Sequence, residues 1–488
     1  MNSNERPYPF GYLFSDKKIN NKPEHYNERI INEKYYYIYD NKTNPSVLTE
    51  NDKFIIIHGE FLHIGIDYQL TNEGLVKRLF ESYFIDYEKF LNLLDFIAGR
   101  YVIIIGNKDQ VKVYPDASNT RSNYYSLKKN ILSSHVFLIN EQCTHERFQF
   151  GKELPEIKNA LLETPFDEIK SLIPNFYFDY NTKKQVRFFP RENNKYNDLA
   201  EEEKFQLIER FWKEQLRHFI NKYNNVVFSL TGGGDSRFSL ALSKEYLDKI
   251  QFFTYATTKD EDTSSKSAAG LSMDYKIVEQ ILDVIRLNHR YIYFIDDKIE
   301  VSEYENSLIN KNTIGRHSSF LIPQIKKHYP LSDLMHIRGN LLEIGKTRYY
   351  STIFKESNIE EVKKVFLKRY SKSKEETMKK YVEDKFEEFV EDLKYDSNVF
   401  DYHLLDLYHW EVRMGRWHTE ILNTHDIIFG TISPFNHRAM IDITLSFPYE
   451  KRRDEFVFKE IINRNFPILN FFGDNELTNL YEKNRRKY

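Results

Sequence analysis

The stretch from Val226 to Leu242, VVFSLTGGGDSRFSLAL, restricts the possible folds of this chain more than any other segment. It begins with an apolar run of β type, breaks at three consecutive glycines (Gly232, Gly233 and Gly234), and continues with apolar residues at helical spacing. We therefore expect a strand, a glycine loop and a helix in succession. Glycines allow the backbone to approach a ligand closely, and a helix start offers unpaired N–H groups. This arrangement is typical of a phosphate-binding loop.

Two other phosphate-binding patterns do not fit this segment. The dinucleotide pattern G-x-G-x-x-G fails because Asp-Ser-Arg-Phe follows Gly234 without a further glycine. The Walker pattern G-x-x-x-x-G-K-[ST] also fails, and its nearest match elsewhere separates Gly339 from Gly345 by five residues instead of four. Asp235 cannot help to bind a bare anion, so its presence predicts a divalent cation shared with phosphate groups. A glycine-rich turn without a ligand is the alternative.

Length and composition predict a globular protein of two or three domains, because the chain has 488 residues, of which 41% are hydrophobic and 29% charged. The net charge of −3 gives no general attraction to nucleic acid or to an anionic membrane. Cys143 is the only cysteine, which excludes disulfide frameworks, Cys-based zinc sites and Cys-pair redox chemistry. Charged and polar residues interrupt every hydrophobic run before about 18 residues. We therefore expect a cytoplasmic protein without a membrane span.

Strand and helix signals divide the chain into two parts of different type. The first segment of about 53 residues is polar and irregular apart from an aromatic run at 35–39. Strand signals and two helical patterns then predict an α+β layout, with strands expected at 54–57, 101–105, 111–114 and 123–126. Beyond a polar linker, a helix over 199–222 leads to the glycine loop. Strands at 251–255 and 291–295 and a helix at 274–287 then complete a βαβαβ pattern. The second sheet should be parallel, with ligands beyond the carboxyl ends of its strands.

The segment from Thr231 to Ser236, TGGGDS, resembles the SGGxDS pyrophosphate loop of the N-type ATP pyrophosphatases, in particular the synthetase domain of asparagine synthetase and its relatives. Three earlier landmarks resemble, in the same order, the glutaminase domain of that family: HGEF at 58–61, GRYV at 99–102 and DASNTRSNYY at 116–125. The resemblance implies an α+β Ntn-hydrolase-like sandwich over residues 1–192. Over 198–488 it implies an α/β domain with a parallel Rossmann-like sheet of the adenine nucleotide α-hydrolase type and extra helices.

The first part departs from the family at the residues that would hydrolyse glutamine. The family's nucleophile is an N-terminal cysteine exposed by removal of the initiator Met, with the terminal amine as base. Here Asn2 follows Met1, the only cysteine is Cys143 inside the domain, and His58 replaces the family's asparagine. We therefore expect a degenerate glutaminase-like domain with Cys143 as a structural thiol. β-Lactam synthetase and the lasso-peptide cyclases likewise resemble asparagine synthetases with a disabled first domain.

The resemblance implies that the second part binds ATP and Mg²⁺. The expected nucleotide-binding residues are Thr231, Gly232, Gly233, Gly234, Ser236, Arg237, Asp274 and Gly339. Asp235 is expected to be catalytic and to hold Mg²⁺. In the segment that resembles the family's second pyrophosphate loop, at 335–350, Leu341 stands at the position of the family's aspartate. Glu343 is the nearest acid and is the expected second metal ligand.

Positive charge for the phosphates is expected from Arg338, Lys346 or Arg348, of which Arg338 is preferred as a catalytic residue. Lys459 is a further catalytic candidate, since it falls near the position of a lysine that contacts the phosphates in relatives. The alternatives are ordinary ones. Asp274 would then be an acid in the first turn of a helix, and Lys459 a surface lysine.

Together these residues imply an ATP-dependent ligase that adenylates a carboxylate, releases AMP and pyrophosphate, and transfers the acyl group to ammonia or an amine. The expected partners are a small-molecule or peptide carboxylate and a nitrogen nucleophile, with no nucleic acid and no membrane. Glutamine-independent asparagine synthesis and an inactive nucleotide-binding scaffold stay open, as does the oligomeric state, with a homodimer as one option. A PP-loop enzyme that modifies tRNA would need a basic surface that the charge pattern does not supply.

Glutamine should not serve as the nitrogen donor, because no cysteine stands where the nucleophile would be needed. Purified protein incubated with glutamine is expected to release no glutamate, and Cys143→Ser is expected to leave the synthetase activity unchanged. Glutamate release that a cysteine-directed affinity label abolishes would contradict this expectation.

Overall fold

The computed structural model describes the chain except for residues 1–5, 67, 148–152, 155, 258–265, 294, 296–298, 316–318, 331–333 and 486–488. Within the described residues, two six-stranded antiparallel sheets form from the first part of the chain and one five-stranded parallel sheet forms from the second. The α+β and parallel-sheet expectations are thereby confirmed. The limits of the two predicted domains stay a prediction.

The first two sheets pack face to face. One has the order β10-β8-β9-β1-β3-β2, and the other β12-β11-β7-β6-β5-β4. Their strands are β1 (Tyr12–Ser15), β2 (Tyr26–Ile31), β3 (Tyr35–Asp40), β4 (Ser46–Glu50), β5 (Lys53–His63), β6 (Ile97–Gly106), β7 (Val111–Pro115), β8 (Tyr124–Ser126), β9 (Ile131–Ser133), β10 (Ile169–Ser171), β11 (Phe176–Asp179) and β12 (Lys184–Arg187). Phe54, Ile56 and Val102 enter the core between the sheets, while Ile55 and Ile57 point to the opposite face. This alternation is the period of two that a strand requires.

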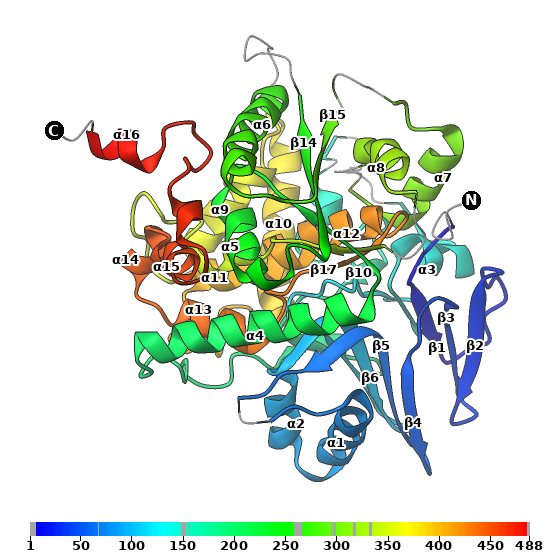
Figure 1. Ribbon diagram of the computed structural model, residues 1–488. Coiled ribbons are helices and arrows are strands. Elements are labelled where there is room, and N and C mark those ends of the chain that lie inside the picture. The colour runs from blue at the N-terminus through cyan, green and yellow to red at the C-terminus, as the bar shows by residue number, and fades with distance from the viewer. Residues whose placement is uncertain are drawn as a thin grey trace.

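Three helices accompany these sheets: α1 (Asn72–Ile85), α2 (Tyr87–Leu94) and α3 (Val136–Gln142). Leu75, Leu79 and Phe90 of α1 and α2 belong to the same buried cluster as Ile55 and Ile57 of β5. The two helices therefore cover the outer face of the β5–β6 sheet, at the bottom of Figure 1.

The parallel sheet has the order β15-β14-β13-β16-β17, so β13 lies at its centre. Its strands are β13 (Asn225–Ser229), β14 (Ile250–Ala256), β15 (His289–Tyr293), β16 (Leu334–Ile337) and β17 (Gly430–Ile432). Helix α4 (Glu201–Lys222) packs Phe211 and Trp212 into the cluster that holds Phe228 of β13. It crosses the middle of Figure 1 between this sheet and the antiparallel layers.

Helices fill the rest of the second part. Those before β17 are α5 (Gly234–Leu242), α6 (Lys266–Val284), α7 (Glu303–Asn312), α8 (Ile322–His328), α9 (Ile359–Tyr370), α10 (Glu376–Leu393), α11 (Leu404–Tyr408) and α12 (Thr419–His425). Those after it are α13 (Arg438–Leu445), α14 (Tyr449–Arg453), α15 (Phe456–Asn465) and α16 (Leu480–Arg485). A π-helical segment, His409–His418, joins α11 to α12. None of the described helices is long and apolar enough to cross a membrane.

Two expectations about local structure need correction. The described residues 6–53 are not irregular, because β1 to β4 lie there. The four middle residues of the edge strand β2 are exposed. Its sequence therefore lacks the alternation of apolar and polar residues by which a strand is predicted. The helix expected to begin at Asp274 begins at Lys266, so Asp274 is not an acid of a first turn.

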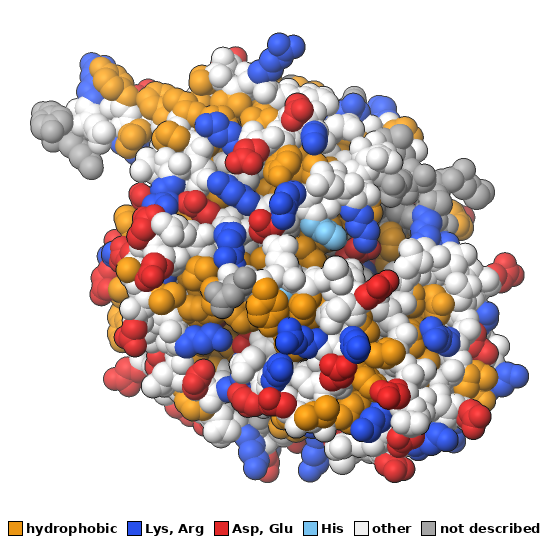
Figure 2. All heavy atoms as spheres, turned by 60° about the horizontal axis from the view of Figure 1, so that its bottom comes forward, with side chains coloured by type: hydrophobic (Ala, Val, Ile, Leu, Met, Phe, Trp, Pro, Cys, Tyr) orange, Lys and Arg blue, Asp and Glu red, His pale blue; other side chains and the backbone are white. Residues whose placement is uncertain are grey.

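On the face shown in Figure 2, Lys and Arg side chains are interspersed with Asp and Glu. A surface of mixed sign agrees with the small net charge of the sequence.

Candidate functional site

The glycine loop lies at the carboxyl end of the central strand of the parallel sheet. β13 ends at Ser229 and α5 begins at Gly234. The Ser236 hydroxyl closes the loop, since its Oγ accepts from the Thr231 N–H at 3.1 Å and donates to the Thr231 carbonyl at 2.9 Å. Gly232 is required by close approach, because a Cβ there would lie 2.7 Å from Cδ1 of Ile277 in α6.

Two backbone amides of this loop bind carboxylates of the protein itself. Gly232 N–H donates to Asp274 Oδ1 at 2.7 Å, and Gly234 N–H donates to Asp474 Oδ1 at 3.0 Å. The amides therefore present donors to anionic oxygens, which is the property a pyrophosphate loop needs. Asp274, an expected nucleotide-binding residue, lies beside the loop. In this structure its carboxylate accepts the hydrogen bond of the Gly232 N–H.

Asp474 belongs to a C-terminal segment that folds over the loop, where Asn475 N–H also donates to the Gly232 carbonyl at 3.3 Å. Arg237 holds this segment, because its Nη1 donates to the carbonyls of Leu469 at 3.1 Å and Phe472 at 2.9 Å. Its Nη2 lies 3.3 Å from Asp474. Arg237 thus positions the segment rather than a phosphate in this structure.

Asp235 forms an ion pair with Lys346, which the sequence offered as an alternative to the preferred Arg338. Lys346 Nζ lies 2.9 Å from Asp235 Oδ1 and 3.1 Å from Glu455 Oε2. Burial raises the pKa of Asp235, and Lys346 acts against this rise. Burial acts to lower the pKa of Lys346, but the two carboxylates outweigh it and raise the pKa overall. A lysine ammonium is therefore held as a cation at the mouth of the glycine loop.

The donor set fits a Mg²⁺ ion only together with phosphate oxygens. Among the described residues, no group of three or more His, Cys, Asp or Glu side chains could hold a metal. Mg²⁺ commonly takes one or two protein carboxylates and completes its shell with phosphates and water. Asp235 could supply one such oxygen. Glu343, the expected second ligand, instead lies 3.7 Å from His409 Nε2, although its charge helps to raise the pKa of Asp235.

Arg338 follows β16, the strand that pairs with β13. Its contacts differ from the ion pair that Lys346 forms with Asp235. Its Nε donates to Asn340 Oδ1, and its Nη1 lies 3.2 Å from His425 Nδ1. Three buried histidines, His336, His418 and His425, surround it, and burial together with the Arg338 charge holds the pKa of each well below its ordinary value. Each of the three has a ring nitrogen without a hydrogen-bond partner among the described residues.

Two other expected residues have roles of a different kind here. Gly339 packs against α5, where an added Cβ would lie 2.8 Å from Ser239 Oγ and 3.0 Å from the Asp235 carbonyl. Lys459 is exposed on α15, and its Nζ donates to the Asp454 carbonyl at 2.8 Å. Its predicted role stays a prediction, and Lys346 is the lysine that the fold brings to the loop.

The residues that would mark a glutaminase centre are engaged in packing. His58 is fully buried, with its Nδ1 2.7 Å from the Tyr37 hydroxyl and its Nε2 3.0 Å from the Phe10 carbonyl. Cys143 ends helix α3, with its Sγ 3.6 Å from His145 Nε2, and burial raises the pKa of the thiol. A raised pKa makes a thiol less nucleophilic at neutral pH.

A comparison with models of known protein families finds no match, and neither does a comparison with curated proteins. Among solved structures, the chain is similar to glutamine phosphoribosylpyrophosphate amidotransferase from B. subtilis complexed with ADP and GMP. The identity is 11% and the TM-score 0.25, over 64% of this chain and 88% of that one. An allosteric regulatory enzyme of purine biosynthesis is also similar, with 9% identity and a TM-score of 0.24, over 78% of this chain and 74% of the other. At this level of similarity, no property of either enzyme is transferred to this chain.

The Asp274 carboxyl should make the stability of the protein depend on pH. Burial raises its pKa from 3.8 to about 6, and the Gly232 N–H opposes the shift only in part. The folded state therefore holds a proton that the unfolded chain has released, and this stabilising contribution is lost as the pH rises from about 4 through about 6. Asp274→Asn keeps an acceptor for Gly232 and cannot titrate. Its Tm should rise relative to the parent across that window.

Thermal unfolding of both proteins at several pH values between about 4 and 7 measures this difference. Asp248→Asn, a change at an exposed aspartate, is the matched control. A Tm difference between Asp274→Asn and the parent that stays constant across the window would contradict the assignment.

Proposed function

We propose that this protein is an ATP-dependent amide ligase that adenylates a carboxylate and transfers the acyl group to ammonia or an amine, without glutaminase activity. The observation that carries the proposal is the glycine loop at the carboxyl end of β13. Its Gly232 and Gly234 amides bind carboxylate oxygens, beside the ion pair of Asp235 and Lys346. A ligand with two linked anionic groups matches such a set of donors and cations.

In the proposed first step, a carboxylate oxygen of the substrate attacks the α-phosphorus of ATP. The bond from this phosphorus to the bridging oxygen breaks, and pyrophosphate leaves with the electron pair. The loop amides and the Lys346 ammonium would stabilise the negative charge that develops on pyrophosphate. Mg²⁺, when bound at Asp235, would supply further charge neutralisation.

Cleavage between the α- and β-phosphates follows from the shape of the loop. A Walker loop wraps the β-phosphate and directs its lysine at the γ-phosphoryl group. The loop from Thr231 to Ser236 is short and contains no lysine, so it would hold only the departing pyrophosphate. The Lys346 cation reaches it from the separate segment after β16.

In the second step, the nitrogen of ammonia or an amine attacks the acyl carbon. The C–N bond forms, the bond from the acyl carbon to the phosphate oxygen breaks, AMP leaves, and the nitrogen releases a proton. Arg338 follows β16, the neighbour of β13, and has a guanidinium that contacts the neutral imidazole of His425. This placement makes Arg338 the cation proposed to orient the substrate carboxylate.

Asp235→Ala should reduce carboxylate-dependent exchange between ATP and labelled pyrophosphate by about a hundredfold or more, because it removes the proposed metal ligand and the partner of Lys346. The exchange is measured across a panel of carboxylic acids, with Asp248→Ala as a control that removes an exposed aspartate. Equal exchange by Asp235→Ala and the parent would refute the role of Asp235. Exchange that no carboxylic acid supports would favour an inactive nucleotide-binding protein.

Asp474→Ala should bind ATP several-fold more tightly than the parent. The Asp474 carboxylate occupies the Gly234 N–H and places a negative charge where a phosphate would bind, so nucleotide must displace it. Equilibrium binding of ATP to both proteins measures the change, and Glu476→Ala, at an acid two residues along the same segment, controls for net charge. An unchanged or weaker affinity of Asp474→Ala would show that Asp474 does not compete with nucleotide.

A further inference from the structure

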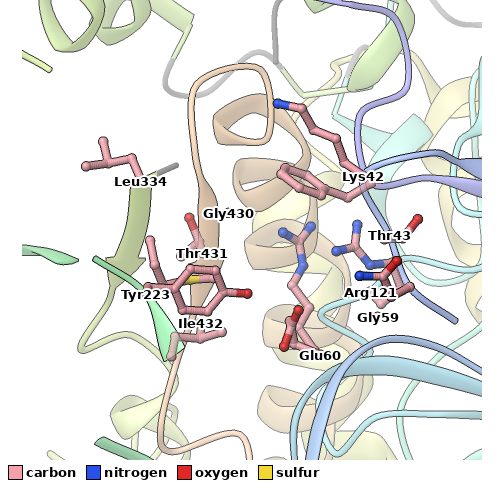
Figure 3. A pocket seen from close by; sticks show the side chains of 14 residues that line it. Lys42, Thr43, Gly59, Glu60, Arg121, Tyr223, Leu334, Gly430, Thr431 and Ile432 are labelled. Atoms are coloured by element: carbon pink, nitrogen blue, oxygen red, sulfur yellow. The ribbon is translucent and has the colours of Figure 1, made fainter. Parts of the chain in front are cut away.

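A cavity of about 340 Å³ lies away from the glycine loop, at the opposite end of the parallel sheet. On one side it is lined by Tyr223, which precedes β13, and by Leu334 and Gly430, the first residues of β16 and β17. On the other side it is lined by Gly59 of β5 and by Arg121. Figure 3 shows these two walls facing each other across the cavity. The glycine loop follows the carboxyl end of β13, so the two sites are separate.

Two buried arginines in this cavity share a single carboxylate. Arg100 binds Asp426 with both Nη atoms, at 2.5 and 2.8 Å, and its Nε donates to the Thr120 carbonyl at 2.7 Å. Arg121 has only one long contact to the same carboxylate, from Nη1 to Oδ2 at 3.4 Å. Its Nε is buried and has no hydrogen-bond partner among the described residues, and the residue as a whole is only 5% exposed.

The charge of Asp116, like that of Asp426, favours the Arg121 cation, but the acids near the cavity also have other partners. Both oxygens of Asp116 accept hydrogen bonds from backbone amides, including the Arg121 N–H at 2.8 Å, and from the side chains of Thr120 and Asn436. Glu60 forms an ion pair with Lys222. Lys42 also lines the cavity and adds positive charge. Burial and the neighbouring Arg100 lower the pKa of Arg121 to about 10, so it remains a cation at neutral pH.

The opposite wall, on the parallel sheet, is mostly apolar. Leu334, Met335 and Ile432 line it together with the ring of Tyr223, and Thr431 adds a hydroxyl there. Phe10, from the N-terminal segment, also lines the cavity. A buried guanidinium is costly, and an anion bound beside Arg121 would give it a charge-assisted hydrogen bond in addition to its one long contact with Asp426. An apolar body attached to that anion would cover the opposite wall, as is usual for small-molecule sites.

We propose that this cavity is a binding site for a small organic anion, with a carboxylate or phosphate group bound by Arg121 and an apolar body packed against Phe10, Met335 and Ile432. The site is independent of the proposed ligase chemistry, because no residue of the glycine loop lines it.

Isothermal titration calorimetry of the full-length protein tests the proposal with four probes: phenyl phosphate, phenylacetate, inorganic phosphate and benzyl alcohol. At least one of the two aromatic anions should bind, and which one binds distinguishes a phosphate from a carboxylate ligand. Inorganic phosphate should bind at least tenfold more weakly than the better aromatic anion, and benzyl alcohol should not bind. Binding of neither aromatic anion, or equal binding of benzyl alcohol, would overturn the proposal, and equal binding of inorganic phosphate would overturn its apolar part.

Arg121→Gln should weaken the binding of that anion at least tenfold, while Arg29→Gln, on the exposed face of β2, should leave it unchanged. Because Arg121 is buried, Asn44→Trp provides a second variant that keeps both arginines and narrows the cavity at an exposed lining residue. It should also weaken binding. Unchanged affinity in a folded Arg121→Gln protein, or in Asn44→Trp if Arg121→Gln does not fold, would overturn the proposal.

Discussion

The buried carboxylate of Asp426 joins the two parts of this molecule. It follows helix α12 and accepts both Nη groups of Arg100, a residue of β6 in the antiparallel layer. Both side chains are almost completely excluded from water, so loss of Asp426 would leave the buried Arg100 charge unpaired, at a cost of about 3–5 kcal/mol. His425, the preceding residue, contacts Arg338 after β16. The same helix end therefore fixes the antiparallel sheets and the parallel sheet against each other.

The glycine loop depends on this framework for its position and on its own amides for its chemistry. In this structure the amides bind Asp274 and Asp474, and Asp235 binds Lys346, so every charged group at the loop has an internal partner. Such pairing costs little to exchange for a ligand that brings phosphates and a metal ion, since one set of charge-assisted hydrogen bonds replaces another. The loop therefore keeps its shape in this structure while the carboxylates of Asp274 and Asp474 occupy its amides.

The sequence was sufficient to predict the parallel sheet and the strand, loop and helix around Gly232 to Gly234, because these depend on local patterns. It was not sufficient for the partners of the loop. Lys346 and Asp474 lie more than a hundred residues from Asp235 in sequence, and Glu455 belongs to a third segment. The packing of α15 on α5 brings Glu455 toward the loop, and Arg237 of α5 holds the segment that carries Asp474. The exposed edge strand β2 was missed for a different reason, since its polar residues resemble a loop.

The nucleotide product tests the central claim most directly. The protein is incubated with ATP, Mg²⁺, ammonia and the carboxylate that supports pyrophosphate exchange, and the nucleotides are then separated. The account predicts AMP and pyrophosphate in equal amounts, because the short loop from Thr231 to Ser236 would hold pyrophosphate as the leaving group. Accumulation of ADP and phosphate would mean that the loop directs attack at the γ-phosphorus, and would contradict the proposed adenylation.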